Sequence, residues 1–342
     1  MEKIKTLLSR AWAGACFLKA AASLFFVAGM GILAVPARMD AAGLRVQDVC
    51  PDAMWAVTVD FGATFGGDAG RSLLNGLLKK REAQVAAFEA GTGFKFALHL
   101  DSVTLSGTGR AGSGAIVLRH HFQDVGKLEK WLASRKGVTR VTRNGIESSG
   151  DRRYRLSANG ISGEGVPGNL PFSWAKPVFV EFGDASGMNV VLIAAEPEEL
   201  DAAWLRLNSL RHPPISLPLY HDMRQDGKGH ALASGFARVE KLMAKRPESL
   251  MKNPAVPHLS RVQDVAFQVL APKAGMLRFD FRGVFKDAST AAAMASMVES
   301  FFIAQAPQFP FLRDATVEPR DATLRIVADV SVEQLLALFS SK

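Results

Sequence analysis

The feature that most limits what this chain can fold into is a short pattern that occurs twice. Residues 119–124 read RHHFQD and residues 282–287 read RGVFKD, so arginine, phenylalanine and aspartate recur in the same order 163 residues apart. In each copy a further aspartate, Asp101 or Asp264, stands 18 residues before the arginine. This gap-free match predicts that the chain contains the same structural unit twice.

The repeated pattern has the properties of a strand that leads into a helix. Between residues 276 and 285, leucine and phenylalanine alternate with arginine and aspartate, which is typical of a strand with one apolar face. Ile116, Leu118 and Phe122 have the corresponding spacing in the first copy. Asp124 and Asp287 are then placed to cap the helix that follows, because a carboxylate accepts hydrogen bonds from the free N–H groups of a first helical turn.

Apolar residues at helical spacing follow each aspartate and predict the buried stripe of each helix. The two stripes are Val125, Leu128, Trp131 and Leu132 in the first copy, and Met294, Val298, Phe301 and Phe302 in the second.

The flanking segments predict the domain organisation. A strand at 55–61 precedes a helix, a weaker strand at 230–236 precedes a shorter one, and each copy closes with a strand and a helix, at 189–200 and 323–335. We expect a first α+β repeat at 50–210, a linker rich in proline and glycine at 211–229, and a second repeat at 230–342. The predicted fold class is therefore α+β, with two tandem similar lobes, each an antiparallel sheet with helices packed on one face.

The N-terminus predicts export. A basic leader precedes an apolar run at 20–37, where Val35 and Ala37 give the small-x-small pattern of a signal-peptidase site before Arg38. Residues 1–37 are therefore predicted to be a signal peptide, or else a membrane anchor through residues 11–35, whose only charge is Lys19. Either interpretation places the protein in the periplasm or cell envelope, with membrane association through the N-terminal segment as an open alternative.

Composition narrows the classes of partner. A chain with 48% hydrophobic and 22% charged residues is typical of a globular protein, and the formal net charge is +8. Short basic clusters occur at 79–81, 152–155 and 245–246, but Tyr154 is the only aromatic residue among them. We therefore expect no nucleic-acid binding and interpret these clusters as solvated surface, with weak affinity for anionic surfaces as the alternative. Once the leader is removed Cys50 is the only cysteine, which excludes an internal disulfide.

Several motifs that resemble functional sites have simpler explanations. His120 and His121 are neighbours on one strand and point to opposite faces, so they do not share a metal ion. We expect His120 to be a neutral imidazole hydrogen-bonded to local backbone. GTGRAG at 107–112 matches a dinucleotide fingerprint, but a strand rather than a helix follows it, which indicates a hairpin turn.

Acidic residues at the start of the predicted helix near 196 are explained as capping and dipole-compensating charges. They are Glu196, Glu198, Glu199 and Asp201. The sequence therefore predicts no catalytic, cofactor-binding or metal-ligating residues, no cofactor, and an enzymatic activity only if a hydrolase site is assembled from distant residues. For Cys50, a small buried apolar side chain is the simpler interpretation, and an intermolecular bridge or a reactive thiol is the alternative.

The order of these features resembles that of uncharacterised exported bacterial envelope proteins with duplicated α+β units. The resemblance lies in the strand and helices at 55–88, the segment DSVTL at 101–105 and the two repeated junctions, and it covers about residues 50–342. It implies an envelope location and supplies no active site.

We therefore expect a non-enzymatic binding or structural component whose partner is an envelope protein. The alternative is a periplasmic carrier of a lipid or other apolar ligand, which the 22 phenylalanines and 11 methionines against 2 tyrosines favour.

Overall fold

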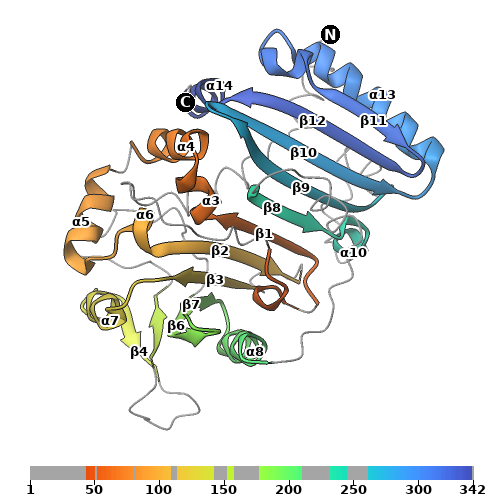
Figure 1. Cartoon of the computed structure of the whole chain (residues 1–342). Helices are drawn as coiled ribbons and strands as arrows, with labels where there is room; N and C mark the ends of the chain where they lie inside the picture. Colours follow the sequence, from red (N-terminus) through yellow and green to blue (C-terminus); the bar gives the residue numbers. More distant parts are fainter. Residues whose placement is uncertain are drawn as a thin grey trace. The chain divides into compact units, whose positions relative to one another are not determined.

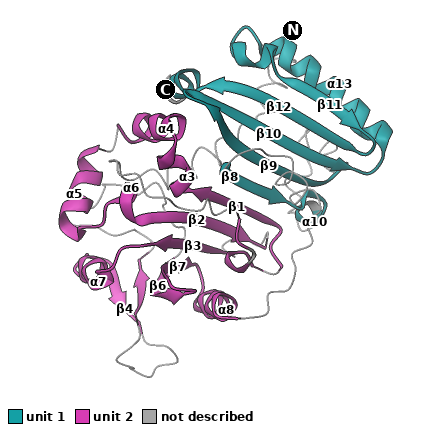
Figure 2. Cartoon of the chain, in the orientation of Figure 1, with its two compact units in different colours: residues 1–28, 217–342 teal, residues 29–216 magenta. Residues whose placement is uncertain are grey.

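A computed structural model describes residues 44–50, 52–79, 82–108, 114–141, 152–157, 177–209, 231–244 and 261–340 (Figure 1). The predicted signal peptide or anchor at 1–37 and the predicted linker at 211–229 lie outside these residues. The chain divides into two compact units, which Figure 2 colours separately: unit 1 comprises residues 1–28 and 217–342, and unit 2 comprises residues 29–216. Each unit is a mixed α+β structure.

Unit 2 contains seven of the described strands, with helices between them. Its elements, in chain order, are η1 (Val46–Asp48), β1 (Trp55–Asp60), α3 (Phe61–Gly66), α4 (Asp68–Leu78), α5 (Glu82–Thr92), α6 (Phe96–His99), β2 (Leu100–Gly107), β3 (Ala115–His120), α7 (Val125–Ala133), β4 (Val138–Arg140), β5 (Arg153–Leu156), β6 (Val178–Ala185), β7 (Met188–Ala194) and α8 (Pro197–Leu207). The strands pair in the order β1-β2-β3-β7-β6-β5-β4, and every pairing is antiparallel.

Unit 1 contains five described strands. Its elements are β8 (Ala231–Ala237), α10 (Val239–Ala244), β9 (Val262–Lys273), β10 (Met276–Phe285), α13 (Ala288–Gln305), η3 (Pro310–Arg313), β11 (Thr316–Arg320), β12 (Thr323–Ser331) and α14 (Val332–Ser340). These strands are also antiparallel and pair in the order β8-β9-β10-β12-β11. In both units the third strand along the chain lies between the second strand and the last described strand of the unit.

The repeated sequence pattern forms the predicted strand-to-helix junction in both units. β3 ends at His120 before α7, and β10 ends at Phe285 before α13. The Asp124 carboxylate accepts from the Lys127 N–H at 3.3 Å, and the Asp287 carboxylate accepts from the Thr290 N–H at 2.7 Å. Both predicted N-caps are confirmed. The Lys127 side chain, which donates to Asp124, is the main cause that lowers the pKa of Asp124, whereas the Thr290 N–H is the main cause that lowers the pKa of Asp287.

The predicted stripe of α13 is partly wrong. Ala291 and Ala295 are the buried residues of this helix, whereas Phe301 is 39% exposed. The alanines allow the helix backbone to approach the sheet closely, and Phe301 consequently lies at the flank of the contact. The stripe of α7 agrees better, since Val125, Leu128 and Leu132 are buried.

The expectation of helices on one face of each sheet is not met in unit 2. α8 packs its buried Leu200, Ala203 and Trp204 against the face of the sheet that carries Val117 and Leu192. His120, which alternation places on the opposite face from Val117, contacts Phe94 from the segment between α5 and α6. Both faces of this sheet therefore bury side chains.

In unit 1 the charged face of β10 is held by ion pairs across the strands. Arg278 and Asp329 are opposite one another and form two hydrogen bonds of 2.7 Å. Asp280 is only 2% exposed and accepts from Arg325 at 2.8 Å and 3.2 Å. Cross-strand pairing thus explains why this alternately charged strand is stable.

Candidate functional site

The most deeply buried charges in the described part of the chain form an ion pair in unit 2. Arg119 of β3 is 0% exposed and Asp48 of η1 is 1% exposed. The Arg119 Nη2 donates to Asp48 Oδ1 at 2.6 Å, and Nε lies 3.1 Å and 3.0 Å from the two carboxylate oxygens. The remaining nitrogen, Nη1, donates to the carbonyl oxygen of Ala185 at 3.3 Å. Every guanidinium nitrogen is therefore used inside the protein.

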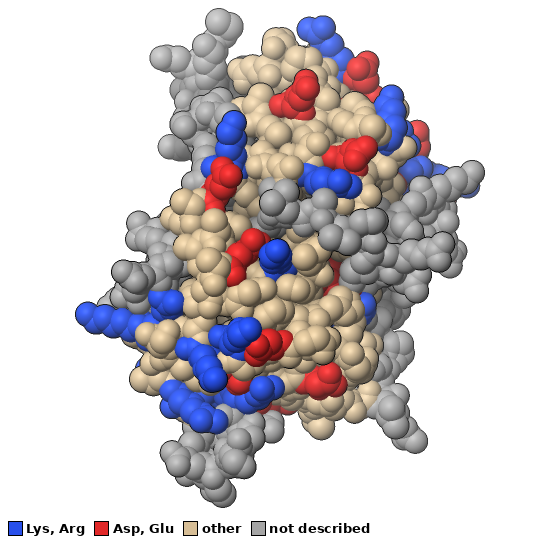
Figure 3. Space-filling view, turned by 60° about the vertical axis from the view of Figure 1, so that its left-hand side comes forward, with Lys and Arg blue, Asp and Glu red and all other residues tan. Residues whose placement is uncertain are grey.

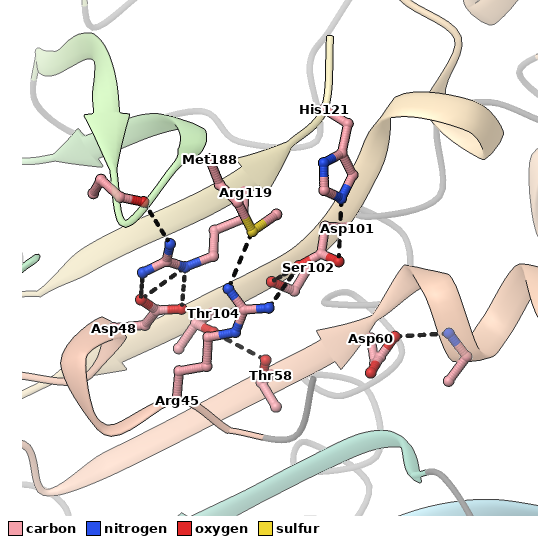
Figure 4. A network of polar contacts seen from close by, with 12 residues as sticks. Arg45, Asp48, Thr58, Asp60, Asp101, Ser102, Thr104, Arg119, His121 and Met188 are labelled. Atoms are coloured by element: carbon pink, nitrogen blue, oxygen red, sulfur yellow. Dashed lines mark hydrogen bonds and ion pairs between the residues drawn. The ribbon is translucent and has the colours of Figure 1, made fainter. Parts of the chain in front are cut away.

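A second pair lies beside the first, as Figure 4 shows. Arg45, just before η1, donates to Asp101 Oδ2 at 3.2 Å and contacts the sulfur of Met188 at 3.3 Å. Asp101 also accepts from the hydroxyl of Ser102 at 3.2 Å. Ser102 is opposite Arg119 in the β2–β3 register, which brings the two ion pairs next to each other.

Hydroxyl groups extend this polar layer across β2 and β1. The Thr58 and Thr104 side chains are opposite one another and share a buried hydrogen bond of 2.9 Å. At the end of β1, the Asp60 carboxylate accepts from the Ala63 N–H at 2.7 Å and so caps α3. The layer therefore links η1 and three strands by hydrogen bonds within the protein.

The burial of Arg119 differs from what the sequence pattern predicts. If the apolar side chains on either side of Arg119 in the sequence face the core, alternation turns Arg119 toward solvent, yet Arg119 is fully buried. The missed partner is Asp48, which lies before residue 50, where the first repeat was predicted to begin. A usable signal was present, because an aspartate between Val46 and Val49 is unusual unless its charge is compensated.

The histidine pair is separated as expected. His120 is 1% exposed and lies against Phe94, whereas the His121 side chain is 45% exposed, with Nε2 at 3.8 Å from Asp101 Oδ1. Burial, followed by the charges of His121 and His99, lowers the pKa of His120 to about 4, which makes the imidazole neutral near pH 7. The predicted backbone hydrogen bond of His120 is wrong, since neither ring nitrogen has a partner among the residues described.

Two of the acidic residues of α8 bind other elements, which the sequence did not predict. Glu199 accepts from the N–H of Gly114 at 3.0 Å, and Asp201 accepts from Arg153 of β5 at 2.6 Å. Glu196 is the N-cap residue, but its side chain makes no capping hydrogen bond. The carboxylates of Glu199 and Asp201 therefore fasten α8 to the sheet rather than satisfy the first turn.

Two further sequence features are partly covered by the structure. Most of GTGRAG lies outside the described residues, but the antiparallel strands β2 and β3 flank it, so no helix follows this motif. Cys50 is half-buried and packs against the core beneath α8. Its sulfur accepts from the Ser106 hydroxyl at 3.3 Å.

The chemistry available to this polar layer is structural. Arg119 and Arg45 form ion pairs within the protein, the hydroxyls are hydrogen-bonded to neighbouring side chains, and each guanidinium nitrogen of Arg119 has a partner. Among the described residues no group of three or more histidine, cysteine or acidic side chains is arranged to hold a metal ion. In the same part of the chain no helix is both long enough and apolar enough to cross a membrane.

Comparison with known proteins gives a likeness of fold only. No protein-family model and no curated protein sequence matches this chain. The structure of crystal form III of TP0453 is similar with a TM-score of 0.51 at 10% identity, covering 89% of this chain and 100% of the other. Crystal form I of TP0453 gives a TM-score of 0.48 at 10% identity, covering 89% and 99%. The α+β fold is thus shared with a solved protein.

We predict that Arg119→Met lowers the free energy of unfolding by about 3–5 kcal/mol, because the Asp48 carboxylate would remain buried without its partner. Arg278→Met is the matched control: its ion pair with Asp329 is about 40% exposed, and its loss should cost about 0–1 kcal/mol. Urea denaturation of both variants measures the difference. The double variant Asp48→Leu/Arg119→Met should recover most of the lost stability. Equal losses in Arg119→Met and Arg278→Met would show that the buried pair is no more important for stability than the exposed pair.

We also predict that His120 makes the protein less stable in acid. Its folded-state pKa of about 4 lies below the usual 6.5, so between these values the unfolded chain binds a proton that the folded chain does not. The stabilising contribution is complete above pH 6.5, and about 3 kcal/mol of it is lost as the pH falls to 4. Denaturation of His120→Leu at a series of pH values should show a shallower acid loss than the wild type.

The exposed neighbour provides the control for this measurement. His121→Gln should retain most of the acid dependence. The pKa of His99 is lowered by burial and then by the charges of Lys95 and His121, so His121→Gln removes one of these smaller causes while the burial of His99 is the same in both variants. Identical pH profiles for His120→Leu and the wild type would show that the buried imidazole does not control this loss.

Proposed function

We propose that this protein is an exported cell-envelope component that acts by binding another envelope protein or as part of its structure, rather than by catalysis. The predicted leader at 1–37 supports export. The buried polar groups of unit 2 support a non-catalytic role, because the Arg119–Asp48 and Arg45–Asp101 ion pairs bind η1 and the segment before it to β3 and β2. The surface of α13 supports a binding role, and this observation carries the proposal.

α13 presents an almost uncharged surface. Over 18 residues its only charged side chain is Glu299, although most of its positions are exposed. Met297 is 42% exposed, Phe301 39% and Ile303 77%, and the other exposed positions of α13 are alanine or serine apart from Glu299. Exposed helices of soluble proteins normally carry charges, whereas the cores of protein interfaces are depleted of them and enriched in methionine and aromatic residues. We therefore infer that α13 contacts a partner protein.

The two units support the further proposal that the chain consists of two tandem similar lobes. The strand order β1-β2-β3-β7-β6 matches β8-β9-β10-β12-β11, except that unit 2 has β4 and β5 in the chain between α7 and β6. The repeated junction stands at the same point of both orders, between the third strand and the helix after it. A duplication of one α+β unit accounts for both facts.

The alternative proposal, a carrier of a lipid or other apolar ligand, rests on the excess of phenylalanine and methionine. A recess of about 350 Å³ in unit 2 is lined by Gly137, Thr139, Arg155, Ser157 and Pro177. Arg155, Thr139 and Ser157 bring polar groups to this recess, but most of its lining surface is apolar, so the recess by itself favours neither proposal. Native mass spectrometry of the protein purified from its own host distinguishes the two proposals, since a retained lipid would favour the carrier.

We predict that the mature protein is found in the envelope fraction and begins at Arg38, because the peptidase pattern ends at Ala37. Cell fractionation followed by N-terminal sequencing measures both properties. If the protein in the envelope fraction retains residues 11–35, this segment is a membrane anchor rather than a cleaved signal peptide. A cytoplasmic product that begins at Met1 would contradict export.

We predict that Ile303→Lys releases the protein from a larger envelope complex, because a charge at this position must be desolvated on docking. Leu205→Lys on α8 is the matched control, since Leu205 is 76% exposed and Ile303 is 77% exposed. Native electrophoresis of detergent-free envelope extracts measures the size of the complex. Wild-type migration of Ile303→Lys, or equal release by both variants, would contradict docking through α13.

A further inference from the structure

The recess in unit 2 lies at the end of its sheet. β4 is the outermost strand and pairs with β5, with Thr139 opposite Arg155. The backbone N–H of Ser157 donates to the carbonyl oxygen of Gly137 at 2.9 Å, which continues the same register by two residues. Because side chains alternate along a strand, Thr139, Arg155 and Ser157 project to one face. The side chains of Thr139, Arg155 and Ser157 therefore lie on the face of the sheet that lines the recess.

Gly137 opens this recess. Its φ is +87°, a conformation that side-chain-bearing residues rarely adopt, and it stands opposite Ser157 in the register. At this position the recess is lined by backbone alone. The recess has a volume of about 350 Å³, which is enough for a small phosphorylated molecule.

Arg155 differs from the arginines next to it. Arg153, two residues earlier on the same face, is buried between Glu181 and Asp201, and Arg152 forms an ion pair with Glu129 at 3.1 Å. Arg155 is exposed and has no hydrogen-bond or ion-pair partner among the described residues. Its five N–H donors are therefore available to a ligand, in the fork geometry that matches two oxygens of one phosphate group.

The segments near the recess carry an excess of basic residues. The described residues 124–141 and 152–157 contain eight lysines and arginines and two acidic residues, and Lys127, Arg152 and Arg153 are already in ion pairs. Lys130, Lys136 and Arg140 are exposed. Figure 3 shows lysine and arginine side chains gathered in the lower part of the view, with acidic side chains between them. Excess positive charge around a recess concentrates anions there.

We propose that this recess binds a phosphate-bearing anion, with Arg155 as its principal ligand and the Thr139 hydroxyl as an additional donor. This inference is independent of α13, which belongs to unit 1. The phosphate group can belong to a soluble phosphorylated molecule or to a lipid headgroup, because the same donors suit both. Basic residues at an edge strand also prevent pairing with other sheets, but that role needs neither an open recess nor hydroxyl donors.

Titration of the protein purified from its own host with glycerol 3-phosphate tests the proposal. We expect saturable NMR shifts at the backbone amides of Gly137, Thr139 and Arg155. Arg155→Gln should raise the Kd by about tenfold through loss of the charged fork. Thr139→Val should raise the Kd by a smaller factor. Unchanged thermal unfolding of Arg155→Gln would show that the loss is not a folding defect, since this side chain has no described partner in the fold.

Arg320→Gln is the matched control, because Arg320 is an exposed arginine at the end of β11, the outermost strand of unit 1. This variant should bind like the wild type. Three outcomes would overturn the proposal for a soluble ligand: no saturable shifts, wild-type binding by Arg155→Gln, or equal losses in Arg155→Gln and Arg320→Gln. The proposal would then stand only if the vesicles described next bind in a manner that depends on Arg155.

Vesicles distinguish the two sources of the phosphate group. Sedimentation with phosphatidylglycerol vesicles, but not with phosphatidylcholine vesicles, that is lost in Arg155→Gln would assign the group to an anionic lipid headgroup. Binding of glycerol 3-phosphate without binding to vesicles would assign it to a soluble molecule. If neither glycerol 3-phosphate nor phosphatidylglycerol binds in a manner that depends on Arg155, the recess is not an anion site.

Discussion

The buried pair formed by Arg119 and Asp48 is the interaction on which the rest of unit 2 depends. Both charged side chains are removed from water, and the desolvation cost of each is offset because the other lies at hydrogen-bond distance. This requirement fixes η1 against β3, and the Nη1 contact to Ala185 adds the end of β6 to the same point. α8 then packs beside η1 on the same face, with Glu199 and Asp201 fastening it at two places.

The arginine of the repeated pattern has different partners in the two units. It is Arg119 in unit 2 and Arg282 in unit 1. In unit 1, Arg282 lies 3.5 Å from Asp280 on its own strand, and Arg325 of β12 also binds that carboxylate. The position of Asp280 in unit 2 is occupied by the buried Val117, so the charge that balances Arg119 has to come from outside the sheet. His120 replaces Gly283, where a side chain would meet the ring of Phe285 at 3.1 Å. Phe94 covers the imidazole instead.

The distribution of polar groups among the described residues is the basis of the two binding proposals. Where the chain brings charges together in its interior, they pair with one another, and the hydroxyls of β1 and β2 do the same. Groups available to a partner lie instead on two separate surfaces, the uncharged exposed side of α13 and the basic end of the sheet at β4 and β5. The first suits an apolar protein surface, whereas the second suits a phosphate group. Each proposal therefore depends on its own residues and can fail alone.

The sequence by itself determined the local features of this protein. Alternation located β3 and β10, and the recurring aspartates marked the starts of α7 and α13, because both signals depend on residues close together in the chain. Only the tertiary structure decided that Arg119 is buried, that Asp48 is its partner, that Phe301 is exposed and that Arg155 has no described partner while Arg153 has two. These outcomes depend on which distant segment covers each face, and periodicity along one strand contains no information about the element that packs on it.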